Sequence, residues 1–146
     1  MVSSARNWQR NGASAQRVMI VEDQVLIAMD LEDTVTRHGN VVVGLATEMR
    51  YAMMLAPMAD IAFVDVNLAD GASGPEIGRL LASDYGITVI FMTANPEMLA
   101  DGVDGTLGVI SKPVMPAVAE QALAYASARR NGALAIVPSG MMLFAG

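Results

Sequence analysis

The chain has 146 residues, of which 53% are hydrophobic and 16% charged, and its formal net charge at pH 7 is −6. This length suits one domain with a buried core, the composition excludes a disordered chain, and the acidic balance argues against a nucleic-acid-binding surface. The absence of cysteine excludes disulfides and thiolate metal sites, and the single histidine excludes a multi-histidine metal centre within one chain.

Residues 1 to 16 are polar and rich in serine, asparagine, glutamine and alanine, which is typical of a flexible N-terminal arm. This stretch lacks the apolar centre of a secretory signal. No run in the chain approaches the roughly eighteen apolar residues of a membrane span. We therefore expect a cytoplasmic protein that makes no contact with a membrane.

After the arm, apolar segments that resemble buried strands alternate with segments of helical spacing. The predicted strands cover residues 17–21, 41–47, 60–66, 87–93 and 106–111. The predicted helices cover residues 24–40, 48–57, 73–86, 95–105 and 114–132. Strands rich in valine and isoleucine without in–out alternation, separated by helices, indicate a parallel sheet covered on both faces. The prediction is a doubly wound α/β fold around a five-stranded parallel sheet.

The alternating pattern ends before the chain does. Residues 17–130 are predicted to form one domain, and residues 131–146 form an apolar C-terminal tail outside the pattern. The sequence "ALAIVPSGMMLFAG" has too much apolar surface for an inert solvated end. We expect this tail to pack on its own domain or on a second copy of the chain, and in the second case a homodimer results.

Polar side chains stand at the ends of four predicted strands. Glu22 and Asp23 follow the first strand, and Asp65 lies near the end of the third. Thr93 ends the fourth strand, and Lys112 follows the fifth. Ligands of open parallel sheets bind beyond the carboxyl ends of the strands. We therefore expect these five side chains to gather at one edge of the sheet.

Three carboxylates beside an ammonium group and a hydroxyl group indicate a specific chemistry. A divalent cation together with Lys112 neutralises the three carboxylates, and oxygen ligands of this kind suit Mg²⁺. Asp65 is then predicted to be a nucleophile that forms an aspartyl phosphate. The cation and Lys112 would hold the phosphoryl oxygens in the transition state.

The short motifs around these residues resemble those of a known family. The stretches "VEDQ", "FVDVNL", "FMTAN" and "SKPV" stand in this order on the first, third, fourth and fifth strands. Together with "DGASGPEI" after the third strand, they resemble the receiver domain of two-component response regulators. The resemblance covers residues 17 to 130 and implies the flavodoxin-like receiver fold.

The resemblance also implies which residues take part in phosphorylation. Asp65 is expected to accept a phosphoryl group from a sensor histidine kinase or a histidine phosphotransfer protein. Thr93 corresponds to the switch hydroxyl of the family, and Lys112 corresponds to the lysine that contacts the phosphate. The Lys112–Pro113 peptide bond is expected to be cis, as is usual there.

A magnesium site is part of the same resemblance. Glu22, Asp23 and Asp65 are expected to bind Mg²⁺, and the backbone carbonyl of Asn67 is expected to complete the protein ligands. Phosphorylation and dephosphorylation of the domain itself are then its only chemistry. The resemblance therefore implies a phosphoacceptor signalling domain and not an enzyme with an external substrate.

Two features depart from the pattern of the family. Receivers usually carry an aromatic residue three positions before the lysine, and Val109 stands there in this chain. The segment 95–105 is a poor helix former because Gly102 and Gly105 lie close together. These departures concern the output route, which usually couples the switch hydroxyl to the aromatic ring.

The sequence leaves alternatives to this function. A pseudo-receiver that binds partners without taking phosphate would not need all five site residues. An aspartate-nucleophile phosphatase usually has a carboxylate two residues after the nucleophile, where Asn67 stands. The roughly sixteen residues after the last helix are too few for an output domain. We therefore expect a stand-alone receiver that serves as a phosphate relay, a phosphate sink or a switch for a downstream protein.

Overall fold

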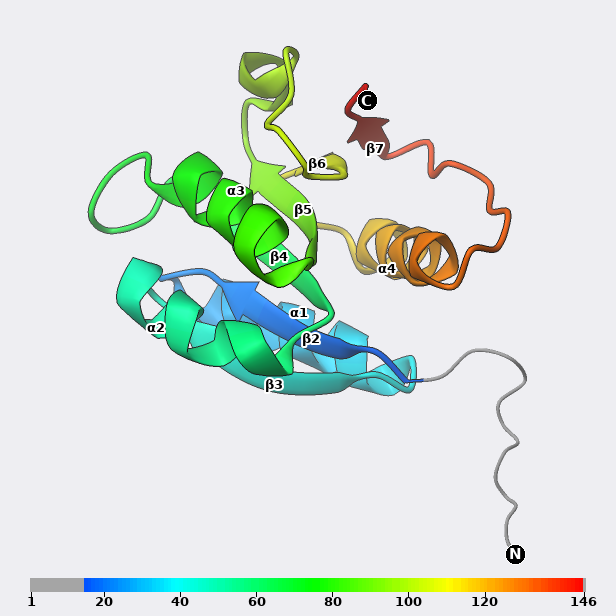
Figure 1. The fold of residues 1–146 in the computed structure, drawn as a ribbon, viewed down its shortest axis with the longest axis horizontal. Coiled ribbons are helices and arrows are strands. Elements are labelled where there is room, and N and C mark those ends of the chain that lie inside the picture. The colour runs from blue at the N-terminus through cyan, green and yellow to red at the C-terminus, as the bar shows by residue number, and fades with distance from the viewer. Residues whose placement is uncertain (1–14, 146) are drawn as a thin grey trace, which may run out of the picture.

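A six-stranded sheet forms the centre of the molecule, and the computed structural model describes residues 15 to 145 (Figure 1). The strands are β2 (Arg17–Val21), β3 (Val41–Ala46), β4 (Ile61–Asp65), β5 (Thr88–Thr93), β6 (Gly108–Ser111) and β7 (Met141–Leu143). Their order across the sheet is β3-β2-β4-β5-β6-β7. Of the arm predicted for residues 1 to 16, residues 1 to 14 lie outside the described residues.

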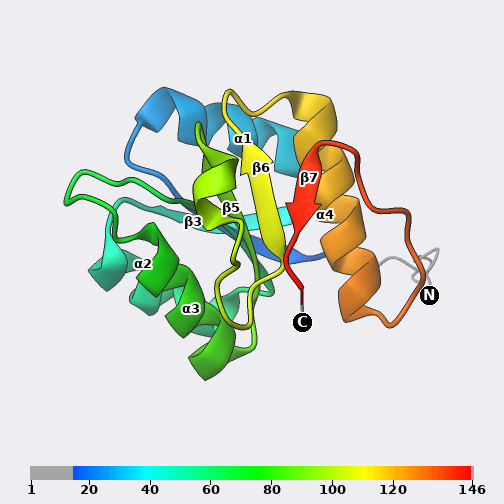
Figure 2. The same ribbon diagram turned by 90° about the horizontal axis from the view of Figure 1, so that it is seen from above.

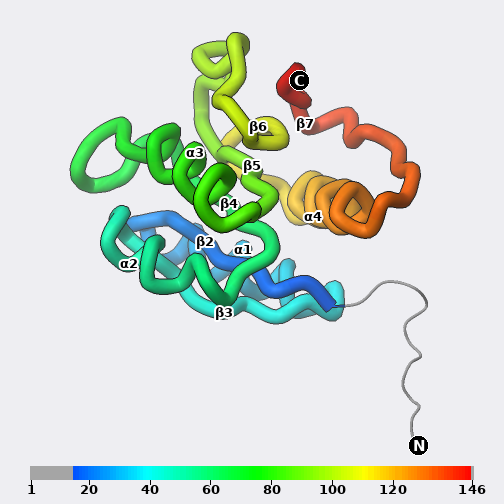
Figure 3. The backbone as a smooth tube through the Cα atoms, viewed as in Figure 1, coloured from blue at the N-terminus to red at the C-terminus, as the bar shows by residue number. Residues whose placement is uncertain are grey.

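The strands from β2 to β6 pair in parallel, which confirms the predicted five-stranded parallel core. The chain passes from β2 outward to β3 and then returns to β4 on the other side of β2, as Figure 3 traces, so the sheet is doubly wound. A sixth strand, β7, which the sequence did not predict, extends this sheet by pairing antiparallel to β6. This strand comes from the apolar tail, which packs on its own domain.

Helices cover both faces of the sheet (Figure 2). They are α1 (Val25–Arg37), α2 (Met49–Leu55), α3 (Gly74–Tyr85) and α4 (Pro116–Arg130), with short 3-10 helices η1 (Ala56–Met58) and η2 (Pro96–Leu99). The helices α1 and α4 lie on one face, and α2 and α3 lie on the other. None of the described helices is long and apolar enough to cross a membrane.

Two apolar cores, one on each face, explain why the strands lack in–out alternation. Phe63 and Ile90 pack toward α1 and α4, whereas Val64 and Phe91, their neighbours in the chain, pack toward α2 and α3. All four side chains are fully buried. A strand that is buried on both faces is apolar at successive positions, as β4 is from Ile61 to Val64 and β5 is from Val89 to Met92.

The segment predicted as a short helix over residues 95–105 forms only the single 3-10 turn η2. Gly102 and Gly105 follow it with φ angles of 80° and 79°. These left-handed conformations end a right-handed helix. The prediction of a helix was therefore correct for less than half of the segment, and the rest is a loop that leads into β6.

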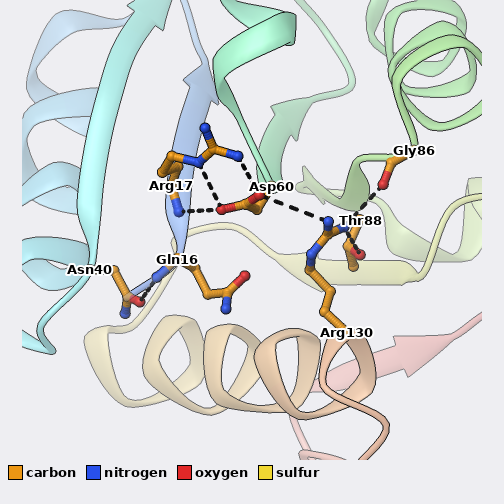
Figure 4. Close-up of polar contacts among 7 residues, drawn as sticks. All are labelled: Gln16, Arg17, Asn40, Asp60, Gly86, Thr88 and Arg130. Carbon is orange, nitrogen blue, oxygen red and sulfur yellow. Dashed lines mark hydrogen bonds and ion pairs between the residues drawn. The ribbon is translucent and has the colours of Figure 1, made fainter. Parts of the chain in front are cut away.

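A polar cluster joins the strands at their amino ends (Figure 4). Asp60 accepts hydrogen bonds from the backbone N–H of Arg17 at 2.9 Å and from its guanidinium at 3.0 and 3.2 Å. Arg130 at the end of α4 donates to the Gly86 carbonyl at 3.0 Å and to the Thr88 hydroxyl at 3.1 Å. The cluster links β2, β5 and α4 at the amino ends of the strands, opposite the carboxyl ends where the predicted site lies.

Candidate functional site

The predicted site residues lie at the carboxyl edge of the sheet. Asp65 is the last residue of β4, and Thr93 is the last residue of the neighbouring strand β5. Glu22 directly follows β2, on the other side of β4, and Lys112 directly follows β6. Each of these residues is the last of its strand or directly follows it, so the strand ends position the side chains.

Lys112 links two of the carboxylates. Its Nζ lies 2.7 Å from Asp65 Oδ2, to which it donates a hydrogen bond, and 2.9 Å from Glu22 Oε1. Burial alone would lower the pKa of Lys112, but the hydrogen bonds to Asp65 and Glu22 outweigh it, so the pKa lies above its ordinary value. The ammonium group is therefore charged at neutral pH and offsets part of the negative charge of the site.

Glu22 is the most deeply placed of the carboxylates, with a residue exposure of 2%. Burial raises its pKa above the ordinary value, although the hydrogen bonds from Lys112 and from the Gln24 backbone N–H act in the opposite direction. The Gln24 N–H donates to Glu22 Oε2 at 3.1 Å. Glu22 Oε1 is buried without a hydrogen bond of good geometry, and its close neighbour is the Lys112 ammonium.

The loop after β4 positions Asp65 through its backbone. The N–H of Asn67 donates to Asp65 Oδ1 at 3.1 Å. At Gly74 a Cβ atom would collide with the backbone carbonyl of Asp65, so the start of α3 approaches the site because this residue lacks a side chain. The ligand role predicted for the Asn67 carbonyl stays a prediction.

The acidic residues have the arrangement that a hard cation requires. Glu22, Asp23 and Asp65 each offer one carboxylate oxygen, and these oxygens all lie within 4.8 Å of one another. Asp23 is half-buried, so the group is open to solvent on one side. Carboxylate oxygens with room for water fit Mg²⁺, which keeps several waters when it binds to proteins.

Thr93 is buried at 4% exposure, and its hydroxyl accepts a hydrogen bond from the Asn95 N–H at 3.1 Å. It therefore connects β5 to the start of η2. The Lys112–Pro113 bond is cis, as expected. Sequence reasoning missed the close approach of Gly74, although a glycine directly before the proline that starts a helix is a signal for a tight contact.

A cleft of about 400 Å³ lies next to Lys112, between α1 and the start of α4. Its walls include Leu31 and Thr34 from α1, and Pro113 and Ala119 from the other side. Three apolar side chains on the elements that border the cleft are exposed, although they do not line it: Leu26 at 78% and Met29 at 52% on α1, and Met115 at 58% directly before α4.

Comparison with known proteins gives consistent results. Residues 18–124 match the response regulator receiver domain. The phyllosphere-induced regulator PhyR of Methylorubrum extorquens is 38% identical over 128 residues, which are 82% of this chain and 48% of that protein. This chain thus spans about half the length of that curated relative.

Two solved structures resemble the fold. The receiver domain of PhyR from Erythrobacter litoralis has a TM-score of 0.72 at 27% identity, covering 84% of this chain and 98% of that one. PhyR from Bartonella quintana, in a complex with the anti-sigma factor NepR, has a TM-score of 0.50 at 37% identity, covering 53% and 33% of the two chains. With the carboxylates, the lysine and the hydroxyl at the strand ends, the match over residues 18–124 shows that this chain belongs to the response regulator receiver domain family.

Proposed function

We propose that this receiver domain takes a phosphoryl group on Asp65 in a Mg²⁺-dependent reaction, from a histidine kinase or a histidine phosphotransfer protein. The observation that carries the proposal is the position of Asp65 between the Lys112 ammonium and two further carboxylates. Its Oδ2 lies 2.7 Å from the Lys112 ammonium, and one of its oxygens lies within 4.8 Å of oxygens from Glu22 and Asp23. A cation and an ammonium on the two sides of a carboxylate suit the stabilisation of a phosphoryl group in transfer.

The reaction exchanges one bond to phosphorus for another. An oxygen of Asp65 bonds to phosphorus while the bond from phosphorus to the histidine nitrogen of the donor breaks, and the imidazole leaves with the electron pair. Lys112 holds the acceptor carboxylate in place and supplies positive charge to the phosphoryl oxygens. Mg²⁺ bound by the three carboxylates would supply further positive charge there. Water later hydrolyses the acyl phosphate, which restores the Asp65 carboxylate and releases inorganic phosphate.

Exposed apolar side chains on the helices that border the site favour a protein as the donor. Leu26 and Met29 lie on α1, and Met115 directly precedes α4. A small phosphodonor would need only the charged groups, whereas a helix or loop of a kinase or phosphotransfer protein would bury these side chains. Such transfers take place in the cytoplasm, where we place the protein.

The signal then passes to another protein by direct contact. PhyR of Bartonella quintana has been solved with the anti-sigma factor NepR, and this chain is 37% identical to the part of PhyR that it matches. We propose a protein target of this general kind downstream. The sequence carries no basic surface that would favour a nucleic acid, since the net charge is −6.

Phosphorylation by a small donor tests the proposal directly. The full chain is incubated with Mg²⁺ and acetyl phosphate, and the intact protein is weighed by mass spectrometry. Wild type should gain one acid-stable, base-labile phosphoryl group, and Asp65→Asn should gain none. Asp70→Asn is the matched control, because Asp70 is an exposed carboxylate in the same loop. Labelling of Asp65→Asn would show that another residue is the acceptor, and an unlabelled wild type would favour the pseudo-receiver.

A further inference from the structure

The side of β6 that faces away from β5 pairs with β7. The two strands pair through Gly108 with Leu143, Val109 with Met142, and Ile110 with Met141. A Cβ atom at Gly108 would collide with the Met142 carbonyl and would lie 3.2 Å from the Leu143 Cα. Because Gly108 has no side chain, the antiparallel strand can approach closely.

The end of β7 has a second set of contacts. The N–H of Phe144 donates to the Leu107 carbonyl at 3.0 Å, and its ring lies 6.3 Å from the ring of Phe91, centroid to centroid. A Cβ atom at Gly102 would lie 3.4 Å from Phe144, so this side of the contact is also tight. The strand β7 thus occupies a defined apolar site at the edge of the sheet.

The segment that carries β7 to this site is exposed. It covers residues 131–140, between α4 and β7, and forms neither helix nor strand. Figures 1 and 2 both show it as a loop along the outside of the molecule. Leu134 is 102% exposed and Ile136 is 93% exposed, so these two apolar side chains have almost no cover in the single chain, whereas Val137 is exposed at 45%.

We infer that β7 is exchanged between two copies of this chain. Each copy then places its β7 on the β6 edge of the other, where it makes the same contacts as in the single chain. The two connecting segments cross and pair with each other, which covers Leu134 and Ile136. Exchange of an identical element is a low-cost route to a dimer, because the native site for the element already exists.

The composition of the segment supports a second copy as its partner. Residues 133–146 contain no charged side chain, although the chain carries a net charge of −6. Repulsion between two acidic copies is therefore weakest where the segments would meet. Leucine, isoleucine and valine in one short run favour pairing as strands. The inference goes beyond the proposed function, because it needs neither Mg²⁺ nor phosphorylation.

Single cysteines test the exchange, because the natural chain has none. Full-length Val109→Cys and Met142→Cys are mixed, equilibrated at high concentration and oxidised. Exchange brings the two positions together across chains, so disulfide-linked heterodimers should form. The control mixes Val109→Cys with Met54→Cys, whose position is exposed at 68% and lies on α2, which packs beside β3 at the opposite edge of the sheet. Heterodimers no more frequent than in the control would overturn the exchange.

A second variant tests the pairing of the connecting segments. Leu134→Ser with Ile136→Ser changes two exposed side chains, so the domain should fold as before. The concentration at which half of the protein is dimeric, measured by light scattering, should rise about tenfold or more when both apolar side chains are lost. Met54→Ser removes an exposed apolar side chain from α2, on the far side of the sheet from β7, and should leave the dimerisation midpoint unchanged. A double variant that dimerises like wild type would overturn the inference.

Discussion

Asp60 shows how a single charged residue supports the fold far from the site. The pKa of Asp60 lies below its usual value, and the hydrogen bonds from Arg17 are the main cause. They outweigh burial, which acts in the opposite direction. The Arg130 guanidinium adds a weaker attraction at 3.9 Å. A carboxyl group whose pKa is lowered by folding stabilises the protein above its unfolded pKa and loses this effect as the pH falls through the folded pKa.

Replacing Asp60 by Asn should therefore destabilise the protein in a pH-dependent way. We expect a loss of about 1 kcal/mol in the free energy of unfolding at pH 7, which is typical of a well-formed ion pair near the surface. The difference from wild type should shrink below about pH 3.8, where the unfolded carboxyl takes up its proton, and should vanish in stronger acid. Urea unfolding at several pH values measures it. A constant difference at all pH values would contradict the role of the charge.

The site residues themselves were predictable because strand ends are recognisable in the sequence. A polar residue after a buried parallel strand must lie at the carboxyl edge, and this rule placed Asp65, Thr93 and Lys112 correctly. The sequence did not indicate that one ammonium would contact both Glu22 and Asp65. Such a contact depends on side-chain conformation and on the spacing of strands that are distant in the chain.

Among the helices, α3 depends on a glycine in its interior. A Cβ atom at Gly78 would collide with the ring of Phe91 and lie 3.1 Å from Val89. Gly78→Ala should thus lower the stability by about 1–3 kcal/mol, because overpacking of the core exceeds the gain in helix propensity. Ser83→Ala on the exposed side of the same helix is the control. Thermal unfolding measures the difference. A higher melting temperature for the Gly78→Ala variant would show that Phe91 and Val89 can move to make room for the added methyl group.

The 3-10 turn η2 is connected to Thr93 of the candidate site. Its start is held by the hydrogen bond from the Asn95 N–H to the Thr93 hydroxyl, and Met98 within it is 79% exposed. If Thr93 turns toward a phosphoryl group, this bond is lost and the turn loses its anchor. We expect beryllofluoride with Mg²⁺ to change hydrogen exchange in residues 95–105 and to leave the centre of α4 unchanged. Asp65→Asn is the control and should not respond to beryllofluoride. If hydrogen exchange in residues 95–105 were equal with and without beryllofluoride in wild type, η2 would not transmit the signal from Thr93.

The elements also show where sequence patterns fail. The five parallel strands are apolar on both faces and were recognised for that reason. In contrast, β7 has only three residues and gains its stability from pairing with β6, which ends thirty residues earlier in the chain. A run as short as "MML" carries no period of its own. Only the apolar composition of the tail indicated that it would pack somewhere.

At the scale of the whole molecule, three of the fifteen acidic residues share one small site where the strands end. Burial raises the pKa of Glu22, so its contribution to the stability of the metal-free protein is complete below pH 4.5 and is lost as the pH rises through the folded pKa. At neutral pH the ionised Glu22 carboxylate therefore lowers the free energy of unfolding of the metal-free protein. A bound cation would offset this loss.

Mg²⁺ should accordingly stabilise the entire domain. A ligand at a hundred times its dissociation constant adds about 2.7 kcal/mol, which corresponds to a rise of roughly 5–10 °C in the melting temperature of a domain of this size. The rise should be larger at pH 8 than at pH 5, because protons compete with the cation for the carboxylates. Calorimetry at matched ionic strength measures it. Asp23→Ala should lose most of the rise because it removes a proposed ligand, whereas Asp70→Asn should keep it. An equal rise in Asp23→Ala and wild type would place the cation elsewhere on the protein.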